Sequence, residues 1–277
     1  MNINEAHFIT FSPTHTSKQV GEAIVRGLEL SENLYTDLTL RAVDSMEIPE
    51  CTLAVIAVPV YAGKVAPLAL ERLKGLHSAG APAVLVVVYG NRAYEAALTQ
   101  LDRFVSERGF KVIAGATFVG EHSYSTEKNP IATGRPDGED LSYAEDFGKK
   151  IRAKIEAAAD MERLYAVDVT RIRRPRQPLF PLFRFLHKVV KLRKSGVPMP
   201  RIPQTDAELC THCGYCAKNC PSAAIVPGDE CHTNQEKCIR CCACVKGCPK
   251  KARTFDTPYA ALLSVCFKRP KENRIIL

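Results

Sequence analysis

The chain has 277 residues with a net charge of +8, and 46% of its residues are hydrophobic. This length and apolar content exclude a small metal-binding module standing alone, and they fit two domains with a full core. Twelve cysteines are present, and all but Cys51 follow residue 209. The uneven distribution predicts an ordinary globular domain followed by a metal-binding module.

The N-terminus and the apolar runs indicate where the protein works. The first residues, Met1 to His7, lack the basic start and apolar stretch of a signal peptide. The longest apolar runs, Leu53–Val60 and Ala81–Tyr89, have the length of strands and are too short to span a bilayer. We therefore expect no transmembrane segment and a cytoplasmic location, where thiols stay reduced.

Residues 1–160 alternate short apolar runs with amphipathic segments of helix length, which is typical of a parallel sheet covered by helices on both faces. The predicted strands are His7–Phe11, Leu34–Leu40, Leu53–Val60, Ala81–Tyr89 and Lys111–Val119. The predicted helices are Lys18–Leu30, Ala66–Leu76, a helix capped by Asn91 that carries Leu98 and Leu101, and 141–158. The pattern predicts an α/β domain with a doubly wound, five-stranded parallel sheet, whose ligands bind beyond the carboxyl ends of the strands.

The loop after the first strand carries clustered hydroxyl groups and leads into a helix. Its candidate ligand-binding residues are Ser12, Thr14, His15, Thr16 and Ser17. Hydroxyls and backbone N–H groups at a helix N-terminus can hold a phosphate. The same residues could also form an ordinary helix N-cap. Neither a P-loop nor a dinucleotide-binding fingerprint is present.

The loops after the third and fourth strands each combine tyrosine with glycine at the same edge of the sheet. Their candidate binding residues are Pro59, Tyr61, Ala62, Gly63, Tyr89, Gly90, Asn91 and Tyr94. Aromatic rings beside a phosphate-binding loop suit a flat, phosphorylated ligand. A tyrosine taken singly is more often a packed residue at the edge of the core.

Residues 161–204 form a basic linker bordered by prolines. Between Arg163 and Arg201 lie eleven lysines and arginines against one acid, Asp168. A helical run in the middle, 182–194, interleaves apolar and basic residues. It can lay its apolar face across both domains, dock an acidic protein partner or contact anionic lipid. No nucleic-acid-binding motif accompanies the charge, and we expect no nucleic-acid partner.

The most specific pattern of the chain is a four-cysteine run that occurs twice, 28 residues apart and each time followed by proline. The first copy holds Cys210, Cys213, Cys216 and Cys220, and the second holds Cys238, Cys241, Cys244 and Cys248. This is the spacing of bacterial two-cluster [4Fe–4S] proteins, in which the fourth cysteine of each run ligates the other cluster. We therefore predict one cluster on Cys210, Cys213, Cys216 and Cys248, and a second on Cys238, Cys241, Cys244 and Cys220.

The alternatives to two iron–sulfur clusters fit the pattern less well. Structural zinc sites close on two CxxC pairs or on Cys/His sets and do not require two repeated runs that end in Cys-Pro. Disulfide frameworks belong to short secreted chains. The cluster module is predicted at 205–258, with hairpins starting near Ile225, and residues 259–277 are predicted to form a tail packed on it.

The chain resembles the flavodoxin-domain ferredoxins, in which a flavodoxin-like domain is fused to a two-cluster ferredoxin domain. The resemblance covers nearly the full length and rests on the cysteine runs and on the Ser12-Pro13-Thr14, Pro59–Gly63 and Tyr89–Tyr94 segments. It implies FMN on the three loops, with the phosphate on the first. The family usually has glycine where this chain has His15, and a left-handed backbone there would be strained for histidine.

The resemblance and the clusters together predict a carrier that passes electrons between two [4Fe–4S] clusters and FMN, with a redox protein as donor or acceptor. One alternative is a flavin-dependent reductase of a quinone, nitro compound or disulfide, in which Glu121, His122 and Arg92 supply protons or hold the substrate. Another is a ferredoxin whose flavin-free domain binds a partner. The sequence does not predict the oligomeric state.

Overall fold

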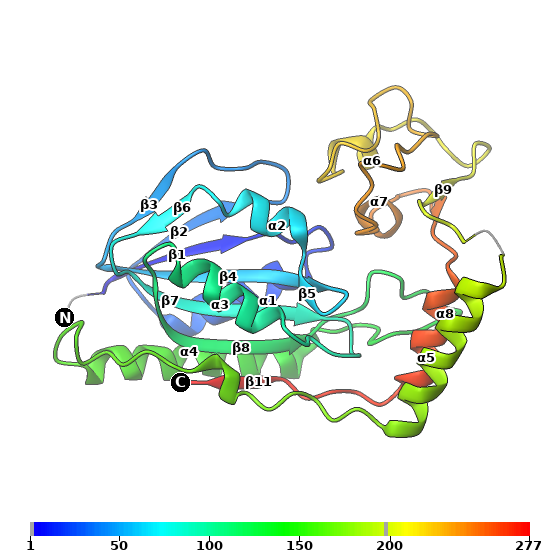
Figure 1. Ribbon diagram of the computed structural model, residues 1–277. Helices are drawn as coiled ribbons and strands as arrows, with labels where there is room; N and C mark the ends of the chain where they lie inside the picture. The colour runs from blue at the N-terminus through cyan, green and yellow to red at the C-terminus, as the bar shows by residue number, and fades with distance from the viewer. Residues whose placement is uncertain (1–2, 197–198) are drawn as a thin grey trace.

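The computed structural model describes residues 3–196 and 199–277; Pro198, one of the border prolines of the predicted linker, lies outside these ranges. Five parallel strands run in the order β2-β1-β4-β7-β8. Their bounds are β1 (Glu5–Thr10), β2 (Glu32–Asp37), β4 (Thr52–Tyr61), β7 (Pro82–Tyr89) and β8 (Lys111–Val119). This is the flavodoxin-like strand order, and the predicted doubly wound sheet is confirmed (Figure 1).

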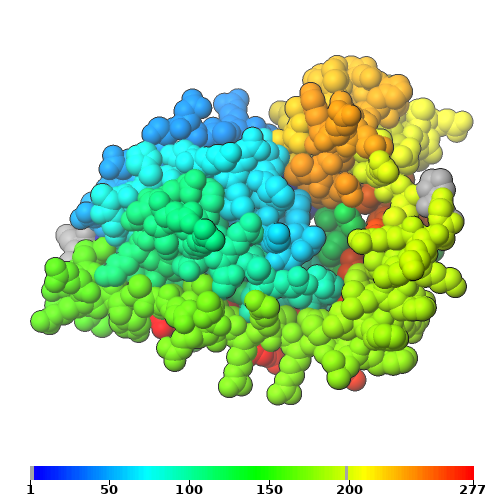
Figure 2. Space-filling model, viewed as in Figure 1, coloured from blue at the N-terminus to red at the C-terminus, as the bar shows by residue number. Residues whose placement is uncertain are grey.

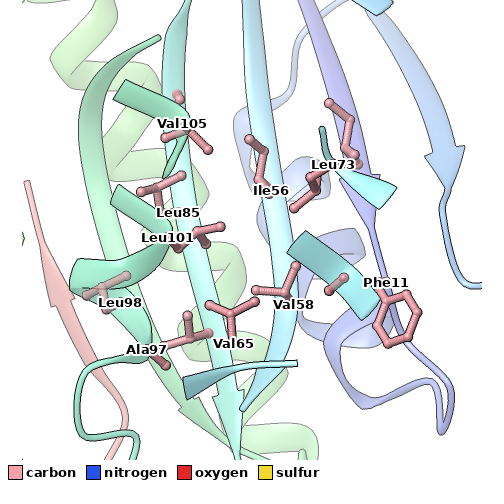
Figure 3. Packing of buried hydrophobic residues seen from close by; sticks show 14 of the residues in the cluster. Phe11, Ile56, Val58, Val65, Leu73, Leu85, Ala97, Leu98, Leu101 and Val105 are labelled. Atoms are coloured by element: carbon pink, nitrogen blue, oxygen red, sulfur yellow. The ribbon is translucent and has the colours of Figure 1, made fainter. Parts of the chain in front are cut away.

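Helices cover both faces of the sheet because successive side chains of each buried strand point to opposite faces. In β4, Ala54, Ile56 and Val58 join one core, and the residues between them join the other. The first core packs against α2 (Pro67–Arg72) and α3 (Ala97–Ser106), as Figure 3 shows. The second packs against α1 (Thr16–Leu28) and α4 (Gly138–Ala157).

Two glycines let α1 and α4 approach closely. A Cβ on Gly27 would lie 1.9 Å from the carbonyl oxygen of Glu145, and one on Gly148 would lie 2.1 Å from that of Ile24. Neither position has room for a side chain. This contact fixes α1, and with it the loop after β1, against the helix that follows β8.

Two of the predicted helices differ from the structure. The helix predicted at Ala66–Leu76 ends at Arg72, and the chain continues as β6 (Leu76–Ser78), which pairs with β3 (Met46–Ile48). A two-residue strand, β5 (Lys64–Val65), folds back on β4. The helix that follows β7 is capped by Ala96, so the prediction of Asn91 as its cap is wrong.

The prediction that residues 259–277 pack on the cluster module is also wrong. The segment forms α8 (Pro258–Cys266) and then returns to the first domain as β11 (Arg274–Ile276), antiparallel to β8. The side chain of Asn91 holds the connection, because its Nδ2 donates to the carbonyl of Phe267 at 2.7 Å and its Oδ1 accepts from Lys271 N at 2.9 Å. Pairing with β11 covers a sheet edge that would otherwise leave backbone groups unpaired.

The linker contains a short 3-10 turn, η1 (Val169–Arg171), followed by α5 (Leu179–Lys194). This helix packs against α8, where Leu182 and Phe185 contact a small core of Ile131, Leu263, Cys266 and Phe267. Figure 1 shows α5 and α8 side by side at the edge of the molecule. No helix in the described part of the chain is long and apolar enough to cross a membrane.

The cluster module is small and has little regular structure. Its strands β9 (Gln204–Thr205) and β10 (Arg253–Thr254) pair, and its helices α6 (Tyr215–Lys218) and α7 (Ala243–Lys246) span four residues each. Ile225 is buried between Cys216 and Cys244 and begins no hairpin strand, contrary to prediction. The module sits on one end of the sheet (Figures 1 and 2).

Candidate functional site

Two sets of four cysteines line two separate cavities in the C-terminal module. Cys210, Cys213, Cys216 and Cys248 line the first, together with Glu230 and Arg253. Cys220, Cys238, Cys241 and Cys244 line the second, where Cys242 and Ile239 also lie. Each cavity therefore draws three cysteines from one run and the fourth from the other, which is the grouping that the sequence predicts.

The backbone repeats along with the cysteines. Six residues with positive φ form three pairs, and the members of each pair are 28 positions apart. The pairs are His212 and Arg240, Gly214 and Cys242, and Ala223 and Lys251. Left-handed turns of this kind let a short loop curl tightly and point several groups inward. The internal duplication of the sequence is thus a duplication of loop geometry.

The thiols lie in sheltered surroundings that differ between the two sets. In the second set, burial raises the pKa of Cys241 to about 12 and that of Cys244 to about 11. The backbone N–H of Ala224 donates to Cys220 Sγ at 3.2 Å. In the first set, Cys213 is exposed. Burial also raises the pKa of Cys216, and the buried guanidinium of Arg253 offsets part of the rise at both Cys216 and Cys244.

A third group of ligand atoms lies beside the first set. The ligand atoms of Cys210, His212 and Cys231 lie within 4.8 Å of one another. Glu230, which is buried, contacts His212 Nδ1 at 3.1 Å. Because Cys210 also lines the first cavity, this group and the four-cysteine set share a ligand.

The second set of cysteines faces the first domain. Ile239 packs against the core that lies beneath α2 and α3. Tyr61, at the end of β4, has its pKa raised by burial and then by the nearby thiols of Cys241 and Cys242. Burial and then Cys242 also raise the pKa of Tyr124 to about 12. The ring of Tyr124 lies 5.1 Å from that of Phe255 in the cluster module.

Two polar contacts join the module to the same end of the sheet. Lys246, at the end of α7, forms an ion pair of 2.6 Å with Glu121 Oε1 and donates to the carbonyl of Ser125 at 2.8 Å. On the other side, the Arg72 guanidinium donates to the carbonyl of Pro221. The module is therefore held at the carboxyl ends of the strands, where doubly wound domains bind their ligands.

A cavity of about 270 Å³ opens at this end of the sheet, between the loop after β1 and the loop after β8. Its lining residues are Thr14, Thr16, Gln19, Glu121, Ser123, Gly134, Arg135, Pro136 and Lys246. Two of the five candidate residues of the first loop, Thr14 and Thr16, thus reach it.

The other three residues of the first loop have different positions. Ser12 Oγ accepts from Lys18 N at 3.1 Å and so supports the loop itself. His15 is exposed and adopts the left-handed conformation, with φ 65°, at the N-cap of α1. Ser17 is fully buried, and its hydroxyl has no hydrogen-bond partner within the described residues.

The second and third candidate loops contribute less than the sequence predicts. Tyr61 is half-buried beside the cluster module, and Ala62 and Gly63 turn the chain with positive φ directly after it; Pro59 is half-buried within β4. Tyr89 and Tyr94, by contrast, lie in the core at 2% and 3% exposure. The Tyr94 hydroxyl donates to the carbonyl of Ile172, so the linker covers this ring.

Gly90 and Asn91 also have structural surroundings. A Cβ on Gly90 would lie 2.3 Å from Cδ2 of His122, so only glycine fits beneath that ring. Asn91 holds the C-terminal segment. The third loop therefore packs inward, and the ring of His122 lies against Gly90. Burial lowers the pKa of His122 to about 4, and its Nδ1 accepts from Tyr124 N at 3.0 Å.

The helix end at the cavity favours an anion, whereas the two cations there are already ion-paired, Arg135 with Asp140 and Lys246 with Glu121. The helix α1 points its N-terminus at it and has no acid in its first turn, which leaves the partial positive charge of the helix end free. Arg135 and Lys246 add two cations and Glu121 one carboxylate. Arg135 is paired with the buried Asp140.

The sequence offered no signal for several of these residues. Lys246 comes from a different domain and reaches the cavity only because the module docks there. Gln19, Gly134, Arg135 and Pro136 belong to no motif, although Glu121 was expected near a site. The loop after β8 is brought to the loop after β1 by the packing of α1 on α4.

One family model matches a segment of the C-terminal module. The family model of the 4Fe-4S binding domain matches residues 202–225, which include the first cysteine run. The C-terminal region is thus a 4Fe–4S ferredoxin-like region, as predicted. No curated protein matches the chain.

Solved structures similar to this chain align with its first domain. A flavodoxin from the domain Archaea is 14% identical, with a TM-score of 0.38, and the match covers 55% of this chain and 99% of the flavodoxin. The apo form of the NADH:FMN oxidoreductase EmoB is 13% identical, with a TM-score of 0.39 and coverages of 59% and 95%. An NAD(P)H:quinone oxidoreductase from Methanothermobacter marburgensis is 12% identical, with a TM-score of 0.36 and coverages of 56% and 98%.

Proposed function

We propose that the protein is an electron carrier that holds two [4Fe–4S] clusters and FMN, as in the flavodoxin-domain ferredoxins that it resembles. The observation that carries this proposal is the docking of the second cysteine set on the end of the flavodoxin-like sheet, next to Tyr61 and the 270 Å³ cavity. A cluster accepts one electron at a time, and a flavin accepts one or two. The chain's part is to hold these groups close together and to shelter them.

The donor sets fit the two clusters. Each cavity offers the four thiols of its set, with Cys242 as a fifth in the second, and the one carboxylate that borders either cavity is that of Glu230 at the first. The backbone N–H of Ala224 donates a hydrogen bond to Cys220 Sγ. Hydrogen bonds to the sulfur ligands help to set the reduction potential of an iron–sulfur cluster. The buried Arg253 guanidinium, whose Nε has no partner among the described residues, supplies positive charge near thiolates of both sets.

The cavity fits the phosphate end of FMN. Thr14 and Thr16 line it at the N-terminus of α1, and the unpartnered hydroxyl of Ser17 belongs to the same turn. The exposed His15 side chain leaves the cavity open, and its left-handed backbone gives the loop the shape for which the family uses glycine. Tyr61 and Tyr124 are the tyrosines that lie next to the thiols of the second cysteine set at this end of the sheet.

The position of the cluster module favours a carrier over a reductase of small molecules. The module covers the end of the sheet at Tyr61 and Tyr124 with Ile239 and Phe255. A substrate ring would have to displace these contacts. The partner is instead a redox protein, which approaches the exposed Cys213 side of the first set, and the free thiols suit a reducing, cytoplasmic compartment.

The experiment that tests the proposal is an analysis of iron, sulfide and flavin in protein purified without oxygen. We expect about eight irons per chain, four for each [4Fe–4S] cluster, and one FMN. Eight irons without flavin, even after FMN is added, would contradict the carrier and favour a flavin-free partner-binding domain. About four irons after reconstitution would contradict the second cluster.

A further inference from the structure

The helix α5 carries two apolar faces, and the fold uses only one of them. Leu182, Phe185 and Val189 point toward α8, where the first two contact the small core and the third is buried. The other face is in solvent: Leu179 is 85% exposed, and Phe180 and Phe183 are 74% and 70% exposed. The role of a tether between domains explains the inner face and leaves the outer face without a function.

The outer apolar residues form one stripe. Leu179, Phe183, Leu186 and Val190 recur at helical spacing, three or four residues apart, and all are exposed. We call these four residues with Phe180 the outer stripe. Large apolar side chains gathered on one surface usually mark an interaction site in a folded protein. Figure 1 shows α5 along the outside of the molecule, and in Figure 2 its atoms form part of the outline.

The surroundings of the outer stripe are strongly basic. From Val169 to Thr205 the sequence has ten lysines and arginines and no acid. On α5 itself, Arg184, Lys188, Lys191, Arg193 and Lys194 are exposed. None of them forms an ion pair within the part of the chain that the structure describes. The charge is therefore free to meet a negatively charged surface.

We propose that the outer stripe of α5 docks the protein on an anionic phospholipid bilayer. The stripe protrudes as single side chains from a convex helix, which suits insertion among acyl chains at the level of the headgroups. The long basic side chains around it can reach lipid phosphates while their stems stay in apolar contact. Charge complementarity selects an anionic lipid surface over a neutral one.

Docking would place the redox sites next to the membrane. The inner face of α5 packs with α8 on Ile131, which belongs to the loop after β8, and that same loop lines the 270 Å³ cavity with Glu121 and Arg135. A bound α5 would thus fix the orientation of the cavity and the cluster module relative to the lipid. The inference is independent of which cofactors the protein holds.

The test is co-sedimentation of the full-length protein, purified without oxygen, with vesicles. Vesicles of phosphatidylcholine containing phosphatidylglycerol are compared with vesicles of phosphatidylcholine alone, at low and at high salt. We expect binding to the anionic vesicles only, weakened by salt. The double variant F180S/F183S should lower the partition coefficient about tenfold or more, because two large apolar side chains no longer enter the interface.

Two further variants separate the contribution of the basic charges from a general effect of removing exposed leucines. Removing three charges in K188Q/K191Q/K194Q should weaken binding to anionic vesicles roughly a hundredfold, at about fivefold per charge near the surface. The matched control L34S/L40S changes two exposed leucines near the opposite edge of the sheet and should bind as the parent does. An unchanged denaturation midpoint in every variant shows that the fold is kept.

Three results would overturn the proposal. The first is the absence of binding to anionic vesicles at low salt. The second is binding to vesicles that is unchanged in F180S/F183S, together with equally strong binding of the protein to polyglutamate. This result would assign the surface to an acidic protein. The third is self-association that F180S/F183S abolishes without any binding to vesicles, which would assign the outer stripe to a second copy of the chain.

Discussion

The two cysteine sets have the same spacing and the same loop backbone, yet they lie in different surroundings. The first set opens toward solvent at Cys213, whereas Cys241 and Cys244 of the second set are buried. The second set also lies next to Tyr61 and Tyr124 at the end of the sheet. The duplicated sequence provides equal ligand chemistry. Because the module packs on the first domain, the first cysteine set lies on the outer side and the second on the inner side.

The largest expected effect is the loss of one whole cluster from a single substitution. Cys220→Ala should remove the inner cluster, although Cys220 belongs to the first run, and Cys248→Ala should remove the outer one. Each variant should lose about four irons per chain. Iron analysis with electron paramagnetic resonance of the reduced protein measures this. The control is Cys242→Ala, which should keep all the iron, and loss of the outer signal in Cys220→Ala would contradict the grouping.

A pH effect should act beside the inner cysteine set through His122, whose ring lies 4.9 Å from that of Tyr124. Burial lowers its pKa from 6.5 to about 4. The unfolded chain therefore takes up the proton first, and stability is lost as the pH falls from 6.5 toward 4. Between pH 7 and pH 5 the loss should be about 2 kcal/mol.

The measurement is the free energy of unfolding by denaturant at both pH values, for the parent and for His122→Asn. Asparagine keeps an acceptor for the N–H of Tyr124 and removes the titrating group, so the difference between the two proteins isolates His122 from the acid sensitivity of the clusters. An equal loss of stability in both proteins would contradict the assignment.

A smaller effect should come from the ion pair that ties the inner side to the sheet. Lys246→Gln breaks the contact with Glu121 and should cost about 1 kcal/mol, since the pair is partly exposed. The matched control is Lys218→Gln, which changes the equivalent residue of the first run, exposed on α6. Hydrogen exchange of residues 121–125 should speed up in the first variant and stay unchanged in the second.

The smallest expected effect concerns the loop after β1. His15 has a φ of 65°, a conformation that costs a non-glycine residue about 1–2 kcal/mol. Glycine would remove that cost and lose about 0.4–1 kcal/mol of chain entropy in return. His15→Gly should therefore stabilise the protein by about 0.5 kcal/mol, measured as a shift of the denaturation midpoint. Destabilisation would show that the exposed imidazole has a contact of its own.

The residues alone predict the five parallel strands and the grouping of the cysteines that line the two cavities. Both depend on short-range order: apolar runs of strand length specify buried parallel strands, and fixed gaps between cysteines set which thiols a tight loop can bring together.

The positions of the loops and of the C-terminal segment depend on contacts between residues that are far apart in the sequence. Asn91 and Tyr94 could equally have faced a ligand, and contacts with Phe267 and Ile172, far along the chain, turned them inward. The C-terminal strand joined β8 because that edge of the sheet lacked a partner. Lys246 reaches Glu121 across 125 positions, and no local pattern records a contact that depends on how two domains meet.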